Sequence, residues 1–234
     1  MNRRAVTLCV VSGLLILSPV AIGQLRKWNQ KMQALAKIFS ELLPELVESE
    51  PPTAATRKRL ERSTKQMLEL AHTINMGPDT KGNPLPPEPD PTIGFVSSIF
   101  EREMKHAYRT LQAGHVDYAK TVLRQMTGYC IACHTRHDRG PDFPTIAAPE
   151  KTSSMTPFER AELFAAIRQF DRALDEFEKI ISDPEGAKRR QIEWGRSLRH
   201  AFTIAIRVKK DPERALAIAD RALSMEEAPS LYRE

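Results

Sequence analysis

Three residues that can bind a cofactor lie together near the middle of the chain. Cys130, Cys133 and His134 form the run Cys-Ile-Ala-Cys-His, at positions i, i+3 and i+4. On an α-helix these positions share one face, so two thiols and an imidazole would point the same way. This spacing is the attachment signature of a c-type haem. The thiols would add across the two vinyl groups as thioethers, and His134 would be an axial ligand to the iron.

The motif is specific in this composition. The chain has 3 cysteines and 6 histidines in 234 residues, and a chance match somewhere in it has a probability on the order of one in a thousand. We therefore expect one covalent haem c with its iron. Three residues beside the motif are candidates for further contacts with the haem, although ordinary packing and solvation explain them about as well: Tyr129, Arg136 and His137.

Two other kinds of site can use the same residues. A thioredoxin-like redox pair shares the spacing of Cys130 and Cys133, but it belongs in a βαβ context, and the sequence predicts no strands. A zinc site would add His134 and His137 to the two thiols. Tetrahedral zinc is usually bound from two elements, whereas these four residues would lie on one helix. Haem attachment is the preferred interpretation.

The N-terminus has the layout of a secretory signal peptide. Two arginines precede an almost entirely apolar run from Ala5 to Leu17, and Ala21-Ile22-Gly23 forms a small-x-small cleavage site. We predict a signal peptide over residues 1–23 and export to the periplasm, with no stable membrane span after cleavage. An uncleaved anchor is the alternative, but Pro19 interrupts an already short apolar stretch. In the exported chain a disulfide within the motif would close too small a loop to stabilise it much.

The composition favours helices. The chain is rich in Ala, Leu, Glu, Lys and Arg, and only 6% of its residues are aromatic, so we predict an all-α fold. The net charge of +5 is a mild excess spread along the chain, and two of the basic residues lie in the predicted signal peptide. Such a charge argues against nucleic acid as a partner.

Apolar residues recur every three or four positions in the first half, and proline-rich stretches separate the periodic segments. Four helices are therefore expected, enough for one bundle. The expected helices cover Leu25 to Val47, about Ala54 to Ile74, about Ile93 to Gln112, and a last one from near His115 through the haem motif to a stop before Gly140.

This arrangement resembles class II c-type cytochromes, the cytochrome c prime group. The resemblance covers roughly Leu25 to Arg139 and rests on the helix count and on the motif near the end of the fourth helix. It implies four antiparallel helices around the haem, with a residue of the first helix facing the second axial position. Met32 lies on the apolar face of the first helix, where low-spin relatives carry a methionine.

The second axial position decides between two functions. A thioether from Met32 would raise the potential and suit electron transfer, whereas an apolar residue there would leave the iron open to small gases. Methionine is also a common core residue, and core packing is the alternative for Met32. If Met32 is only core, the alternative ligands are His72, Met104 and His106.

The second half changes pattern after the segment from Asp142 to Ser154, which contains Pro144 and Pro149. Two pairs of short helices follow each other about 42 residues apart, which is typical of α-solenoids. This half resembles tetratricopeptide repeats over roughly Pro157 to Pro229. The predicted organisation is a signal peptide (1–23), a four-helix-bundle haem domain (24–140), a linker (141–156) and the repeat region (157–234).

These features predict an exported monohaem cytochrome that transfers electrons and is not an enzyme. A redox partner protein would dock at the haem edge or on the repeat region. Two alternatives remain: a five-coordinate haem protein that binds or senses gas, and an interaction scaffold in which the repeats recruit partners and the haem is a sensor or a structural core.

Overall fold

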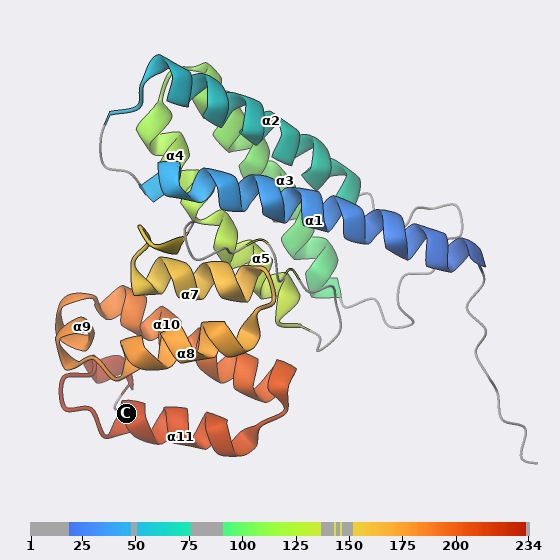
Figure 1. Cartoon of the computed structure of the whole chain (residues 1–234). Helices are drawn as coiled ribbons and strands as arrows, with labels where there is room; N and C mark the ends of the chain where they lie inside the picture. Colours follow the sequence, from blue (N-terminus) through green and yellow to red (C-terminus); the bar gives the residue numbers. More distant parts are fainter. Residues whose placement is uncertain are drawn as a thin grey trace, which may run out of the picture.

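The protein is a stack of helices, shown in Figure 1. The computed structural model describes residues 19–47, 51–75, 91–136, 143, 146 and 152–232. Every regular element in these ranges is helical, which confirms the predicted all-α class. None of the helices in these ranges is long and apolar enough to cross a membrane. Most of the predicted signal peptide, residues 1–18, lies outside the described part of the chain.

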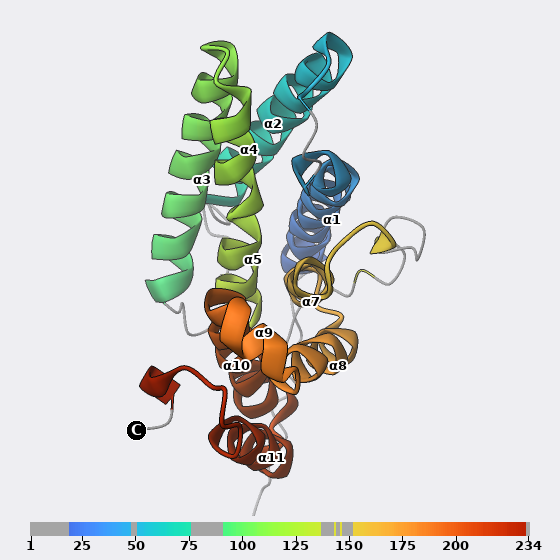
Figure 2. The same cartoon turned by 90° about the vertical axis from the view of Figure 1, so that its left-hand side faces the viewer.

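The described residues of the first half form five helices. Buried leucines and methionines from these helices belong to one apolar core. Helix α2 packs between α1 and α3, and α3 also packs against α4 and α5. Figure 2 shows α3, α4 and α5 running side by side. The five helices are α1 (Pro19–Val47), α2 (Ala54–Asn75), α3 (Pro91–Gln112), α4 (Val116–Arg124) and α5 (Met126–His134).

The predicted fourth helix is two helices, so the prediction of one continuous helix through the motif was wrong. The chain tightens at Gln125, where two backbone N–H groups reach carbonyls only three residues back: Gln125 to Val122 and Gly128 to Gln125, both at 3.1 Å. The hydroxyl of Thr127 also lies 3.1 Å from the carbonyl of Arg124. Such side-chain bonds compete with the regular helix ladder. Helix α5 then ends at His134, earlier than the predicted stop before Gly140.

Two helical pairs follow in the second half. The hairpin of α7 (Pro157–Ala166) and α8 (Phe170–Ile181) precedes a short α9 (Pro184–Arg189). Helix α10 (Gln191–Thr203) continues into a π-helical turn, η1 (Ile204–Lys209), and then α11 (Pro212–Leu223) and a 3₁₀ turn, η2 (Ser230–Tyr232). Helix α10 packs on both α8 and α11. The two successive helical pairs were predicted, whereas α9 and η1 were not.

Local sequence explains where α7 begins. Thr156 accepts a hydrogen bond from the backbone N–H of Glu159, and the Glu159 carboxylate accepts one from the backbone N–H of Thr156 at 2.9 Å. This capping box satisfies backbone donors that a helix start leaves unpaired. Pro157 occupies the first helical position, where its missing N–H is no loss. The capping box and Pro157 therefore fix the N-terminal end of α7.

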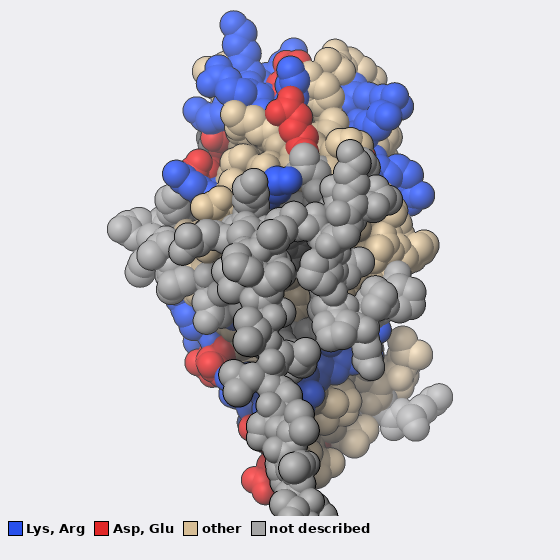
Figure 3. Space-filling model, turned by 90° about the vertical axis from the view of Figure 1, so that its right-hand side faces the viewer, with Lys and Arg blue, Asp and Glu red and all other residues tan. Residues whose placement is uncertain are grey.

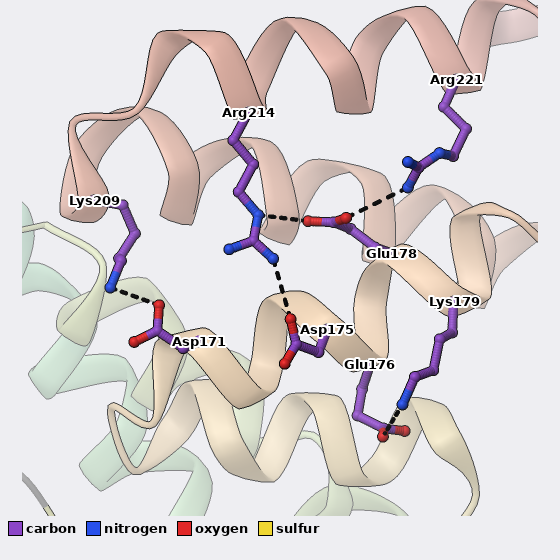
Figure 4. A network of polar contacts seen from close by, with 8 residues as sticks. All are labelled: Asp171, Asp175, Glu176, Glu178, Lys179, Lys209, Arg214 and Arg221. Atoms are coloured by element: carbon purple, nitrogen blue, oxygen red, sulfur yellow. Dashed lines mark hydrogen bonds and ion pairs between the residues drawn. The ribbon is translucent and has the colours of Figure 1, made fainter.

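Surface ion pairs connect α8 with η1 and α11 (Figure 4). The guanidinium of Arg214 lies 2.6 Å from Glu178 and 3.2 Å from Asp175, and Arg221 lies 3.4 Å from the second oxygen of Glu178. Lys209 pairs with Asp171 at 2.6 Å. Exposed pairs of this kind contribute about 0.2–1 kcal/mol each. Apolar packing holds this half together, and Trp194 is fully buried in it. The indole N–H of Trp194 donates to the carbonyl of Ile181.

The two halves pack against each other through α5 and α7. Their buried side chains form one continuous cluster that runs from Leu35 to Ala228. Within the predicted linker, Phe143 and Met155 are buried in that cluster. The end of the motif helix is therefore in contact with the second half of the chain.

Candidate functional site

The three motif residues lie at the end of one helix, as their spacing predicted. Cys130, Cys133 and His134 all belong to α5. Both cysteines are free thiols with partly buried side chains. Because α5 is a regular α-helix here, the two thiols and the imidazole occupy the same side of its last turns. The arrangement satisfies the local requirement for attaching one planar cofactor at three points.

A hydrogen bond determines the tautomer of His134. The Nδ1 atom lies 2.5 Å from the backbone carbonyl oxygen of Ala166, at the end of α7. A carbonyl oxygen only accepts hydrogen bonds, so Nδ1 must carry the proton and donate it. The Nε2 atom of the neutral ring then keeps its lone pair. This is the arrangement that metal-binding histidines typically have.

Burial keeps the site uncharged. It lowers the pKa of His134 to about 4; the hydrogen bond to Ala166 opposes this shift, and the positive charge of Arg168 adds to it. Burial also raises the pKa of the Cys130 thiol to about 12, with a further contribution from Cys133. At neutral pH the imidazole is therefore neutral, and the Cys130 side chain is a protonated thiol.

A small apolar cavity lies beside Cys130 and His134. It has a volume of about 30 Å³, room for one or two water molecules. Apart from these two residues its lining is hydrocarbon and thioether from α1, α2, α3 and the end of α7. The lining residues are Met32, Leu35, Ala36, Phe39, Met67, Phe100, Cys130, His134, Ala166 and Ile167.

The chemistry of the lining residues suits a haem, but the cavity in this structure is smaller than a haem. The free thiols, the His134 tautomer and the apolar lining are what a covalently bound porphyrin with an iron ligand requires. Pockets for organic ligands, in contrast, usually enclose about 300–1,000 Å³. A porphyrin would occupy space that side chains of α1, α2 and α3 fill here. Attachment would therefore be accompanied by a separation of α1 from α5 and α7.

Met32 is the one predicted second ligand that reaches this cavity. Its partly buried side chain lines the wall contributed by α1. The other three candidates do not line it. His72 is exposed, with its Nδ1 2.7 Å from a carboxylate oxygen of Glu101, and His106 is exposed against the ring of Tyr118. Met104 is fully buried in the core.

Met67 of α2 is a second thioether on the cavity wall, and sequence analysis missed it. It is only 1% exposed, whereas Met32 is partly exposed. The helical periodicity identified Met67 as an apolar residue of its helix, and a core methionine carries no local sign that distinguishes it from a ligand. The two methionines are therefore rival ligands that experiment must separate.

The two described residues that flank the motif, Tyr129 and Arg136, do not line the cavity. Tyr129 meets Phe100 edge to face, with ring centroids 6.5 Å apart, and burial and Glu103 raise its pKa against the opposing charge of Arg102. Arg136 is partly buried just after α5 and does not line the cavity. His137 lies outside the described residues.

Besides Ala166, two more residues contact His134 without having been expected from the sequence. The Nη1 atom of Arg168 donates to the backbone carbonyl of His134 at 2.8 Å. The ring of Phe143 stacks on the imidazole, with centroids 6.3 Å apart and 22° between the planes. Both contacts join segments more than eight residues apart, so no local pattern could reveal them. The only available signal was chemical: a metal-binding histidine needs a partner for its second nitrogen.

The alternatives of a zinc site and a redox pair gain no support from the described part of the chain. Among those residues, no group of three or more His, Cys, Asp or Glu side chains is arranged to hold a metal ion. The fourth zinc ligand of that alternative, His137, lies outside them. The same residues form no strand, so they provide no βαβ context for a thioredoxin-like pair.

No family model, no curated protein and no solved structure matches this chain. The resemblances to class II cytochromes and to tetratricopeptide repeats therefore stay predictions. The residues and their geometry are the basis on which the function of the chain is inferred.

Proposed function

We propose that this protein is an exported monohaem c-type cytochrome that transfers electrons. The observation that carries the proposal is the environment of His134. It is a partly buried, neutral imidazole that follows two free thiols on one helix, and its Nδ1–H donates to the Ala166 carbonyl. A histidine that only packs in the core would give no reason for two thiols beside it on the same helix. The combination corresponds to an iron ligand beside two attachment points.

Each residue of the site would have a separate task. Cys130 and Cys133 would hold the haem as thioethers, and the Nε2 atom of His134 would bind the iron. Bound haem would supply a metal that alternates between the ferric and ferrous states. The apolar walls from α1, α2 and α3 would exclude water. Met32, which lines the cavity, would supply a thioether as a second ligand and would favour the ferrous state.

Gas binding is the second candidate, and the cavity lining is the observation that favours it. Leu35, Phe39 and Phe100 stand on the same walls as the two methionines. If hydrocarbon rather than sulfur faces the iron, a small neutral gas could bind in a pocket without charged groups. A low-spin reduced spectrum unchanged by carbon monoxide supports electron transfer, and a high-spin spectrum that shifts with carbon monoxide supports gas binding.

A basic surface near the start of α2 suits an acidic redox partner. Arg57, Lys58, Arg59 and Arg62 are exposed there. From the side drawn in Figure 3, the upper end of the molecule shows Lys and Arg side chains with some acidic side chains among them. Complementary charge accelerates encounter and makes it sensitive to salt. In the proposed function, electron exchange with an acidic partner would slow as ionic strength rises.

Covalent haem is the first test. The full-length chain is produced in cells equipped for cytochrome maturation and then extracted with acidified acetone, which removes haem that is not covalently bound. We expect the wild type to stay red and the C130S/C133S double variant to lose its colour. Ala132→Ser is the matched control, because it places a hydroxyl between the two cysteines without removing either thiol. A colourless wild-type protein would overturn the proposal.

A further inference from the structure

Residues at the end of α7 and in the turn after it bind both the side chain and the main chain of His134. At the side chain, the Ala166 carbonyl accepts the Nδ1–H at 2.5 Å. At the main chain, Arg168 Nη1 donates to the His134 carbonyl at 2.8 Å. That carbonyl lies at the end of α5, where helical carbonyls lack partners of their own. Ala166, the last residue of α7, thus orients the imidazole, and the α7–α8 turn that follows it, residues 167–169, closes the helix that carries the imidazole.

The turn is held in an unusual backbone shape. Arg168 has φ 61°, in the left-handed region that disfavours residues with a side chain. Glycine or asparagine would be the easy choice there. The neighbouring N–H groups bond back into α7, with Arg168 N–H to Ala165 at 3.2 Å and Gln169 N–H to Phe164 at 2.8 Å. A strained arginine persists only where its surroundings over-determine it.

The strained backbone at Arg168 places its side chain in a buried position. Arg168 is 8% exposed, and its guanidinium packs over the ring of Phe170 at 5.1 Å from the centroid. The next residue, Gln169, donates from its side-chain amide to the Phe143 carbonyl at 2.7 Å. Phe143 in turn stacks on the His134 ring. The guanidinium is therefore buried in one cluster with the imidazole it positions.

We propose that Arg168 is the positioning residue of the haem site, so that the second half of the chain sets the orientation and donor strength of the axial imidazole. The proposal rests on the proposed function of His134 as an iron ligand. With Arg168 in place, the Ala166 carbonyl stays aligned with Nδ1–H, and that hydrogen bond makes Nε2 a stronger donor. Without it, the α7–α8 turn loses its hydrogen bond to the main chain of His134, and the imidazole hydrogen bond to Ala166 weakens.

The test measures hydrogen exchange of the His134 Nδ1–H by ¹H–¹⁵N NMR in the full chain, both without haem and with haem attached. The variant is R168N, because asparagine tolerates positive φ but lacks the reach of arginine. The control is K210N: Lys210 is the other non-glycine residue with positive φ in the described part of the chain, at 57°. It directly follows η1 and is exposed.

We expect exchange about tenfold faster in R168N than in the wild type and in K210N, the scale of losing one charge-assisted hydrogen bond. Arg168→Lys keeps a cationic donor on a long side chain and should restore part of the protection. If R168N does not fold, R168G removes the side chain at a residue type for which positive φ is easy.

Two failures are distinguishable. Equal exchange rates in R168N and wild type, with haem attached to both, would overturn the positioning role and leave the proposed function standing. A wild-type chain that never attaches haem would overturn the function, and the protein without haem would still report whether Arg168 protects the imidazole.

Discussion

The two sides of His134 are built differently. On the side of the second half, the His134 imidazole donates a hydrogen bond to the Ala166 carbonyl, and the His134 carbonyl accepts one from Arg168. On the side of the first half, it meets an apolar cavity of about 30 Å³ whose walls are hydrocarbon and thioether. One side is polar and already arranged, and the other is closed by apolar packing.

The difference indicates an order of events for a haem protein. Hydrogen bonds have preferred directions, so the imidazole is oriented before any iron arrives. Dispersion contacts are non-directional, and the walls from α1 and α2 can repack around a large apolar cofactor. The side of the second half would therefore determine the first axial ligand, and the side of the first half would determine the second ligand only after haem is in place.

Removing His134 should have the largest effect on the site. In H134A the two proposed thioethers would still hold the haem, but the iron would lose the imidazole that the second half of the chain orients. We expect the visible spectrum to change completely in both oxidation states, with added free imidazole restoring part of the wild-type spectrum. Absorption spectroscopy of the purified variant measures this. An H134A spectrum identical to that of the wild type would contradict ligation by His134.

The two methionines test the apolar side. Met32→Ala should convert a low-spin iron to a high-spin iron that binds carbon monoxide, with a modest loss of stability because Met32 is partly exposed. Met67→Ala should keep the spin state and lower the free energy of unfolding by about 2–5 kcal/mol, since Met67 is fully buried. Visible spectra and thermal melts of both variants separate ligand from core. The reverse assignment of effects would make Met67 the ligand.

Sequence predicted the parts of this molecule that depend on neighbouring residues. The second helix was expected over Ala54 to Ile74 and is found over Ala54–Asn75, because apolar spacing and flanking prolines act locally. The spacing of Cys130, Cys133 and His134 is equally local, and their shared helix was expected. These features follow from the periodicity of a helix.

Long-range contacts account for what sequence did not reveal. The break at Gln125 accompanies a contact between Thr127 and Glu162, 35 residues apart, at 3.0 Å. The acceptor for His134 is a backbone carbonyl, a group that every residue has. Arg168 adopts positive φ without being glycine or asparagine, so the usual sign of such a turn is missing. Such contacts exist only once α7 lies against α5.

Glu162 tests how the oriented side is supported. It is a buried carboxylate of α7 that contacts Thr127 of the α4–α5 segment and pairs with Arg196 of α10. In E162Q one charged partner becomes neutral, and we expect the free energy of unfolding to fall by about 1–3 kcal/mol. Because Glu162 does not touch the cavity, the spin state of the iron should stay that of the wild type. Chemical denaturation and visible spectra measure the two effects.

Glu178 provides the matched substitution and the smallest expected effect. Like Glu162 it pairs with arginines, here Arg214 and Arg221. Its side chain is 22% exposed, however, and the side chains of both arginines are more exposed than that. Water and salt screen such pairs, so E178Q should lower the free energy of unfolding by at most about 1 kcal/mol, less still at high salt. Denaturation at two ionic strengths measures this. If E178Q lowered the free energy of unfolding as much as E162Q, burial between α5, α7 and α10 would not explain the contribution of Glu162 to stability. The side of His134 formed by the second half would then be stabilised by apolar packing of α7 rather than by its polar contacts.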